Sequence, residues 1–452
     1  MGQRNPSPGQ GSVLPPRAVL RSSIEGALEE LRGPQHRAAV LSASQATGGR
    51  SLVLSAVQEG RPVPKDEHPA LAADVLDRAR KELERLPPDP IAVAGFVNTD
   101  DIALSLVLTQ IAEKHAAAPP PRPGVLKDIT GVKRYELLDP GWWGSLANRL
   151  VHKRVGFIAH TFPLDFRVEV AEERLSLALV GDWGTGLPSS HAIAGHMTAL
   201  NPAFTIHLGD VYYSGTTGEV KSRFLPDWPA GALGTFAINS NHEMYAGGEG
   251  YFGITLKQDP FRLQKASYFC LSTPGWQVIG LDSAYEASDL LYQKGRLSDS
   301  QIGWLKAQLA EGARRGQRSI VLTHHNPLPA GEGGLDDGLL NQMLEAANPN
   351  PFDFWYWAHE HVTARFAPYG APGRQFLGRC VGHGGVPYAP ETAGSKKGGG
   401  VVEWTETELA GDPDEPRRAK NGFVSLVLDS GTRKAEETFI DEFGVQKKSG
   451  SF

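Results

Sequence analysis

Hydrophobic positions follow two different periods in different parts of the chain. In HPALAADVLDRARKELERL, from His68 to Leu86, apolar side chains recur every three to four residues with charged residues opposite. That period predicts an amphipathic helix. A second helix is predicted after Asp100 and Asp101, which can cap it, through IALSLVLTQIAEKH. We therefore expect a mostly helical region over residues 18–118.

Proline-rich and glycine-rich segments border this helical region. Residues 1–17 are rich in Pro, Gly and Ser, which predicts a disordered N-terminus. The stretch AAAPPPRPG, residues 116–124, cannot continue a helix because proline lacks the backbone donor and clashes with the preceding turn. We expect a connector over residues 119–170 and a second domain over residues 171–452.

From about Ala171 the pattern changes to short apolar runs of four to seven residues, as buried strands require. Helical patterns separate some of these runs, among them HAIAGHMTAL and SDSQIGWLKAQLAEGARRG, the latter capped by Ser298. Strands that alternate with helices predict an α/β fold with a largely parallel sheet. Ligands bind such sheets beyond the carboxyl ends of the strands.

Five apolar runs stop at side chains that can bind metal ions. The runs are SLALV before Gly181-Asp182, TIHL before Gly209-Asp210, TFAIN before Ser240-Asn241-His242-Glu243, SIVLT before His324-His325, and FDFWYWA before His359-Glu360-His361. Taken singly, each end has an ordinary explanation, since a Gly-Asp pair is often only a turn and His-x-His often marks one face of a sheet. Together they predict one site at one edge of the sheet.

The residue types at this edge suit two metal ions. Carboxylates, an amide oxygen, imidazoles and a phenol form a mixed oxygen and nitrogen set, which favours Fe, Zn or Mn. His359 and His361 lie two residues apart, so on an ideal strand they point the same way. Asp210 is the natural bridge between two cations because a carboxylate has two oxygens.

The ordered blocks GDWG, GDVYY, NHE, VLTH and HEH resemble the calcineurin-like metallophosphoesterases, and the tyrosine block is similar to their purple acid phosphatase branch. The resemblance covers residues 175–386, and residues 422–444 look like the closing hairpin of that fold. It implies an αββα sandwich of mixed sheets flanked by helices, which the mostly helical N-terminal region precedes.

The resemblance also implies roles for single residues. A first metal would be held by Asp182, Asp210, Tyr213 and His361, and a second by Asp210, Asn241, His324 and His359, with Fe paired with Fe, Zn or Mn. Asp210, Asn241 and His242 would form the catalytic group, His242 orienting the phosphate and assisting the leaving group. Glu243 would hold His242, and Tyr212 would point elsewhere and pack.

Three positions leave alternatives open. Counting from Val321 favours His324 as the ligand, whereas counting back from Pro327 favours His325, and we choose His324. Ser240 and Ala358 stand where the family usually has glycine, and both are small enough for close packing. His383, in the stretch CVGHGGVP, could contact phosphate or be structural.

The expected activity is hydrolysis of phosphate esters through a metal-activated hydroxide, with phosphomonoesters favoured. A phosphodiesterase, a protein phosphatase and a nuclease of the same superfamily are alternatives, as is an inactive regulatory or binding protein. The substrate would be a phosphorylated small molecule or a phosphoprotein. The helical region 18–118 could bind a protein partner or pack as a cap.

Composition and charge limit the partners and the cellular location that we expect. The 452 residues carry a net charge of −6, which disfavours a nucleic-acid partner. No secretory h-region is present, and no stretch approaches the roughly 18 apolar residues of a membrane span, so a cytoplasmic protein with no membrane contact is the expectation. Two cysteines, Cys270 and Cys380, are too few for a disulfide scaffold. A single bridge between them is an alternative, and we expect reduced core thiols.

Overall fold

The computed structural model describes Asp77, Arg80 and Lys81, and then residues 152–287, 292–330, 337–394, 400–411 and 417–452. The chain divides between His152 and Lys153 into two units, and the fold described below is that of the second. Asp77, Arg80 and Lys81 are helical, and Asp77 pairs with both basic side chains. The other predictions for residues 1–151 lie outside the described residues.

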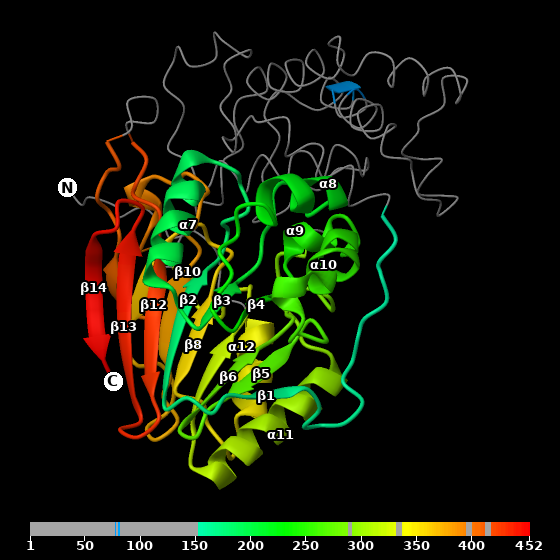
Figure 1. Ribbon diagram of the computed structural model, residues 1–452, viewed down its shortest axis with the longest axis vertical. Helices are drawn as coiled ribbons and strands as arrows, with labels where there is room; N and C mark the ends of the chain where they lie inside the picture. Colours follow the sequence, from blue (N-terminus) through cyan, green and yellow to red (C-terminus); the bar gives the residue numbers. More distant parts are fainter. Residues whose placement is uncertain are drawn as a thin grey trace, which may run out of the picture. The chain divides into compact units, whose positions relative to one another are not determined.

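Two mixed β-sheets build the second unit (Figure 1). The larger has the strand order β1-β5-β6-β7-β8-β10-β9-β11 and the smaller the order β14-β13-β12-β2-β3-β4. The strands of the larger sheet are β1 (Arg167–Glu169), β5 (Phe269–Ser272), β6 (Trp276–Gly280), β7 (Arg318–Leu322), β8 (Phe354–Trp357), β9 (Thr363–Phe366), β10 (Leu377–Val381) and β11 (Val402–Thr405). Those of the smaller are β2 (Arg174–Val180), β3 (Phe204–His207), β4 (Gly234–Ala237), β12 (Gly422–Asp429), β13 (Lys434–Asp441) and β14 (Gln446–Ser451).

Helices connect these strands and cover the outer faces of both sheets. They are α7 (Pro188–Leu200), α8 (Thr217–Glu219), α9 (Asn241–Met244), α10 (Glu249–Gly253), α11 (Asp299–Arg315) and α12 (Asp337–Ala346), with short turns η4 (Val220–Phe224), η5 (Thr255–Lys257), η6 (Asp259–Phe261) and η7 (Pro390–Thr392). The Ser298 side chain caps α11 by accepting from the Gln301 amide, as the sequence predicts.

Parallel pairing aligns the strand ends that carry the predicted ligands. In the smaller sheet β2, β3 and β4 run parallel to one another. In the larger sheet β7 runs parallel to β6 and β8. The predicted α/β fold with two mixed sheets is therefore confirmed, and so is the closing hairpin, since β12 pairs antiparallel with β13.

Alternating side chains of the strands fill three apolar layers. The layer between the sheets takes residues such as Leu177, Ile206 and Phe354 from the inward faces of β2, β3 and β8. Ala178 and Val180 face outward from β2 and pack with α7, which lies over β2 and β12 in Figure 1. The second unit is thus layered as helices, sheet, sheet and helices.

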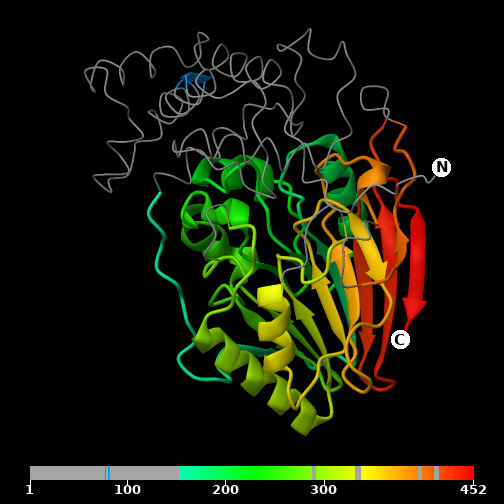
Figure 2. The same cartoon turned by 180° about the vertical axis from the view of Figure 1, so that it is seen from behind.

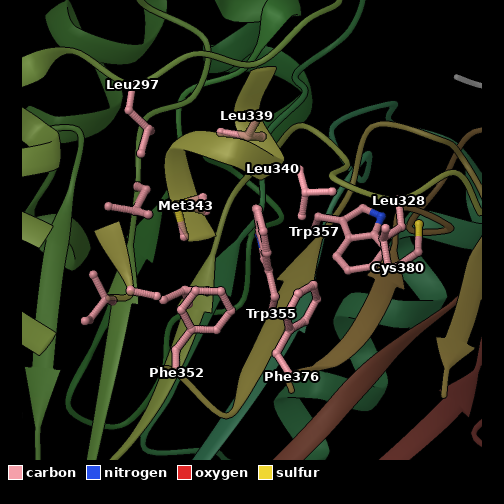
Figure 3. Close-up of a cluster of buried hydrophobic side chains, with 14 of the residues drawn as sticks. Leu297, Leu328, Leu339, Leu340, Met343, Phe352, Trp355, Trp357, Phe376 and Cys380 are labelled. Carbon is pink, nitrogen blue, oxygen red and sulfur yellow. The ribbon is translucent and has the colours of Figure 1, made fainter. Parts of the chain in front are cut away.

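The third layer lies between the larger sheet and the helices α11 and α12, which face the viewer in Figure 2. Trp355 and Trp357 point outward from β8 and meet Met343 of α12, Phe376 and Cys380 (Figure 3). The large aromatic area buried here holds β8 in place. Because β8 leads directly to His359 and His361, this packing fixes the base of the predicted site.

Residues 153–170 lie in the second unit. They supply β1, which pairs with β5, and Arg154 donates to the Tyr292 hydroxyl at 3.0 Å.

Cys270 and Cys380 are both free thiols and fully buried, in agreement with the prediction. Within the described part of the chain, no helix combines the length and the apolar character that crossing a bilayer requires.

Candidate metal centre

The turns that follow the parallel strands hold the predicted ligands in an unusual backbone conformation. Asp182 has φ 56°, Asp210 has φ 76° and His359 has φ 71°, all in the left-handed region that residues other than glycine rarely adopt. Gly209, with φ 101°, gives the chain the freedom to turn before Asp210. Such strain of roughly 1–3 kcal/mol per residue concentrates at functional sites and persists only where the surrounding fold enforces it.

One group of ligand atoms gathers around Asp182, Asp210 and His361. Each of the three offers one atom, and these atoms all lie within 4.8 Å of one another. The Tyr212 hydroxyl lies among them, 2.8 Å from Asp182 Oδ1, 2.9 Å from Asp210 Oδ2 and 2.8 Å from His361 Nε2. Both carboxylates are fully buried, and the His361 ring beside them is partly exposed.

A second group gathers around His324. Its Nε2 lies 2.8 Å from Asn241 Oδ1, 3.3 Å from Asp210 Oδ1 and 3.2 Å from His359 Nδ1. Asp210 therefore faces the first group with Oδ2 and the second group with Oδ1. That is the position which a bridging carboxylate requires.

The hydrogen bonds behind His324 and Asn241 leave electron pairs facing each other. His324 Nδ1 donates to the Leu208 carbonyl at 2.9 Å, so in the neutral ring Nε2 carries a lone pair. The Asn241 amide nitrogen donates to the Tyr245 hydroxyl at 3.1 Å, which turns its carbonyl oxygen toward that lone pair. Two electron pairs 2.8 Å apart repel unless a proton or a cation lies between them. The residues present thus fit a bound metal ion.

The electrostatics of the cluster agree with this interpretation. Burial, and then the neighbouring Asp210 carboxylate, raises the pKa of Asp182 well above its usual range. Burial lowers the pKa of His324 to about 4 and holds the pKa of His359 well below its usual range, so both imidazoles are neutral at pH 7. Neutral imidazoles are the form that binds a metal ion, and a bound cation would offset the burial and the repulsion that raise the pKa of Asp182.

Comparison with known proteins agrees with the geometry. Residues 175–363 match the family model described as calcineurin-like phosphoesterase. These residues belong to the calcineurin-like phosphoesterase superfamily. The match begins at β2 and ends at β9, so it contains all five ligand-bearing strand ends of the phosphoesterase region.

Curated relatives match over a short stretch. The 3',5'-cyclic adenosine monophosphate phosphodiesterase CpdA of Escherichia coli strain K12 is 37% identical over 70 residues, which are 16% of this chain and 23% of that protein. The CpdA of Escherichia coli O157:H7 matches with the same values. The chain therefore spans less than a quarter of the length of the curated relatives it matches.

Three solved structures are distantly similar. GAP50, the anchor in the inner membrane complex of Plasmodium, matches with a TM-score of 0.46 and 12% identity over 62% of this chain and 88% of that one. The purple acid phosphatase PPD1 of yellow lupin, Lupinus luteus, matches with a TM-score of 0.44 and 14% identity over 62% of this chain and 54% of that one. A dimetal phosphatase from Danio rerio matches with a TM-score of 0.42 and 11% identity over 61% of this chain and 98% of that one. The superfamily assignment rests on the family model.

The tyrosine that reaches the candidate site is Tyr212, whereas Tyr213 was expected there. Tyr212 was expected to point elsewhere and pack, and this is wrong, because its hydroxyl contacts three of the predicted ligands. The Tyr213 ring instead faces the Arg223 guanidinium, whose carbon lies 5.2 Å from the ring centre, so the arrangement does not support Tyr213 as the phenol ligand. Asp210 adopts the left-handed region with φ 76°, and Tyr212 lies in the turn that follows it. This turn brings the Tyr212 hydroxyl back to the Asp210 carboxylate, at 2.9 Å from Oδ2.

Glu243 supports Asp210 and not His242, in contrast to the expected role. Its carboxylate accepts from the amides of Asp210 at 3.3 Å and Val211 at 3.1 Å. The Ser240 hydroxyl contacts the carboxylates of both Asp210 and Glu243. Burial, and then Asp210, raises the pKa of Glu243 to about 8. The sequence argument treated Ser240 only as a small residue and missed its polar contacts.

The two remaining histidines near the site have different surroundings. His325 Nδ1 lies 2.8 Å from the Ser283 hydroxyl and Nε2 lies 2.7 Å from the Tyr292 carbonyl, so both ring nitrogens are engaged away from the cluster. This favours His324 over His325 as the ligand. The His383 ring is 2% exposed, and burial lowers its pKa to about 3, which does not support a phosphate contact.

His242 lies at the edge of the first group. Its Nδ1 donates to the Tyr213 carbonyl at 2.5 Å, and its Nε2 lies 3.7 Å from Asp210 Oδ2. The carbonyl fixes which nitrogen keeps its proton, as partners of site histidines commonly do. Nε2 is therefore the nitrogen available for chemistry at the site.

Proposed function

We propose that the chain is a dinuclear metal-dependent phosphoesterase. The observation that carries the proposal is the placement of Asp210, whose two carboxylate oxygens face two separate groups of ligand atoms. The match of residues 175–363 to the calcineurin-like phosphoesterase family supports a phosphate ester as the substrate.

The proposed ligand sets keep the predicted residues with one change. Asp182, Asp210 and His361 would hold the first ion together with the Tyr212 phenol, and Asp210, Asn241, His324 and His359 would hold the second. Hard oxygen and nitrogen donors suit Fe, Zn or Mn, and we propose Fe with Fe, Zn or Mn. When bound, the two cations neutralise phosphate charge and lower the pKa of a coordinated water towards neutrality.

The protein's own residues position the reaction. The Leu208 carbonyl orients His324, and the backbone amide of His359 donates to Asp182 Oδ2 at 2.9 Å, which joins the loops after β2 and β8. His242, held through Nδ1, uses Nε2 to orient the phosphate and to give a proton or a hydrogen bond to the leaving oxygen. Burial of both aspartates strengthens every charge interaction at the site.

Among substrates we favour phosphomonoesters, and we keep phosphodiesters as the alternative. The partial match to two cyclic adenosine monophosphate phosphodiesterases is the observation that favours the alternative. A protein phosphatase and an inactive regulatory protein are further alternatives. A cytoplasmic location and a protein partner for residues 18–118 also stay proposals, which cell fractionation and pull-down with that region would test.

A panel of esters tests this function. Protein reconstituted with Mn²⁺, Zn²⁺ or iron is assayed with p-nitrophenyl phosphate, bis-p-nitrophenyl phosphate, cyclic AMP and a phosphopeptide. We expect metal-dependent release of product from the monoester, lost in Asp210→Asn and kept in the control Asp259→Asn, which changes an exposed aspartate of η6. Turnover of the diesters alone would support the phosphodiesterase alternative. No turnover with any metal would contradict the proposal that the chain is an enzyme.

A further inference from the structure

A short helical segment beside the site makes hydrogen bonds to the backbone that carries Tyr212 and Tyr213. Glu219, at the end of α8, accepts with its carboxylate from the amides of Tyr213 at 2.5 Å, Ser214 at 3.1 Å and Thr216 at 3.1 Å. In turn, the Thr216 hydroxyl accepts a hydrogen bond from the Glu219 amide and so caps α8. A capping box needs only that reciprocal pair, whereas Glu219 also binds two amides further back along the chain.

Arg223, four residues later in η4, binds the same stretch from the other side. Its Nη1 donates to the Tyr212 carbonyl at 2.8 Å and lies 3.8 Å from Glu219 Oε1. Its guanidinium stacks over the Tyr213 ring at 5.2 Å. A Cβ placed on Gly186 would lie 3.4 Å from Arg223 Cγ, so the aliphatic part of Arg223 also runs along the loop that follows Asp182.

Three consecutive backbone groups are bonded as a result. The Tyr212 carbonyl accepts from Arg223, the Tyr213 amide donates to Glu219, and the Tyr213 carbonyl accepts from His242 Nδ1 at 2.5 Å. One end of this stretch bears the Tyr212 phenol that touches Asp182, and the other end sets the orientation of the imidazole. A shift of the stretch therefore moves both groups together.

We propose that Glu219 and Arg223 are positioning residues that act as a pair and set the Tyr212 phenol and the His242 imidazole for the reaction. The inference rests on the proposed phosphoesterase function. It predicts that loss of either residue slows turnover more than it weakens substrate binding, because misplacement of a reacting group by about 1 Å can cost on the order of 100-fold in rate.

Arg223 gives the first test. In Arg223→Ala we expect kcat with p-nitrophenyl phosphate to fall about 10- to 100-fold, KM to change by less than about threefold, and the metal content of the purified protein to match the wild type. Arg223→Lys keeps a donor for the carbonyl and should recover part of kcat. The matched control is Arg262→Ala, an exposed arginine that contacts the Asp259 carbonyl, and it should leave kcat unchanged.

Glu219 tests whether the two residues act as one unit. Glu219→Ala should lower kcat, while the control Glu249→Ala, an exposed acid at the start of α10, should not. The double variant at Glu219 and Arg223 should lose no more than the worse single variant, because both act through the same stretch. Losses that multiply, an unchanged kcat or a change in KM alone would each overturn the inference.

A readout without substrate separates this inference from the proposed function. In protein labelled with ¹⁵N-histidine, the Nδ1 proton of His242 should give a slowly exchanging NMR signal, assigned by its loss in His242→Asn. Its loss from Arg223→Ala supports the positioning pair even if no ester is hydrolysed. A signal that persists unchanged in Arg223→Ala overturns the inference even if the wild type is an active phosphoesterase.

Discussion

The close approach of Gly181 and Ala358 joins the two loops that carry Asp182 and His359. A Cβ placed on Gly181 would lie 2.2 Å from Ala358 Cβ and 3.1 Å from Leu208 Cβ. Carbon atoms in contact normally stand about 3.5–4.0 Å apart, so Gly181→Ala forces the loops to part by roughly 1.5 Å. The hydrogen bond from the His359 amide to Asp182 lies at this contact and would be stretched.

The loss of stability in Gly181→Ala can be estimated, and a second substitution, Ala358→Gly, should partly reverse it. Overpacking of this kind destabilises by about 1–3 kcal/mol. Ala358→Gly alone should cost about 1.5 kcal/mol through the lost methyl group and the added backbone freedom. Because the clash is with the Ala358 methyl group itself, the double variant should be more stable than Gly181→Ala by about 1 kcal/mol, although Leu208 still limits the recovery.

Thermal unfolding followed by tryptophan fluorescence measures these differences, at about 2–4 °C per kcal/mol for a domain of this size. Binding of Mn²⁺ should weaken in Gly181→Ala and recover in the double variant. Gly303→Ala is the matched control, because nothing lies within 4 Å of the Cβ it adds to α11, and it should not lower Tm. A Gly181→Ala protein as stable as the wild type, or additive losses in the double variant, would refute the reasoning.

Three other predictions concern single side chains. Burial lowers the pKa of His207 to about 3, so below the unfolded value of 6.5 the unfolded chain binds a proton that the folded chain does not. Stability is therefore kept above pH 6.5 and lost as the pH falls towards 3. His207→Phe should reduce the slope of the free energy of unfolding against pH in that window by about 1.4 kcal/mol per pH unit, as denaturant titrations at several pH values would measure. Burial raises the pKa of the Cys270 thiol to about 12 and that of Cys380 above its usual range, so at pH 8 both should resist a thiol reagent until guanidinium unfolds the protein, and rapid labelling of native protein would contradict their burial. Tyr212→Phe should lower kcat/KM about tenfold or more and Tyr213→Phe much less, and the reverse order would restore the expected assignment of Tyr213.

The sequence pattern predicts what depends on neighbours along the chain. The five strands that lead to the ligands and the helices α7 and α11 follow from periodicity and caps, the closing hairpin follows from the family resemblance, and each is present near its expected bounds. Their convergence at one edge follows from parallel pairing, which alternation with helices indicates. That edge is where Asp182, Asp210 and His361 meet.

What depends on distant partners could not be predicted in this way. Residues 167–169 form β1 by pairing with β5, which lies far away in the sequence, and so short a stretch is a weak strand signal by itself. Glu243 turns to the Asp210 amide because α9 packs it there, a contact 33 residues apart. The choice between Tyr212 and Tyr213 depends on the turn after Asp210, whose left-handed backbone conformation no local sequence pattern specifies.

Metal content tests the central claim most directly. After reconstitution and removal of free metal, elemental analysis of the wild type should find about two ions per chain, and Asp210→Asn should hold fewer than about one, because both groups of ligands use that carboxylate. The control Asp259→Asn should match the wild type. A wild-type protein that retains no metal, or an Asp210→Asn protein that retains as much as the wild type, would contradict the dinuclear site.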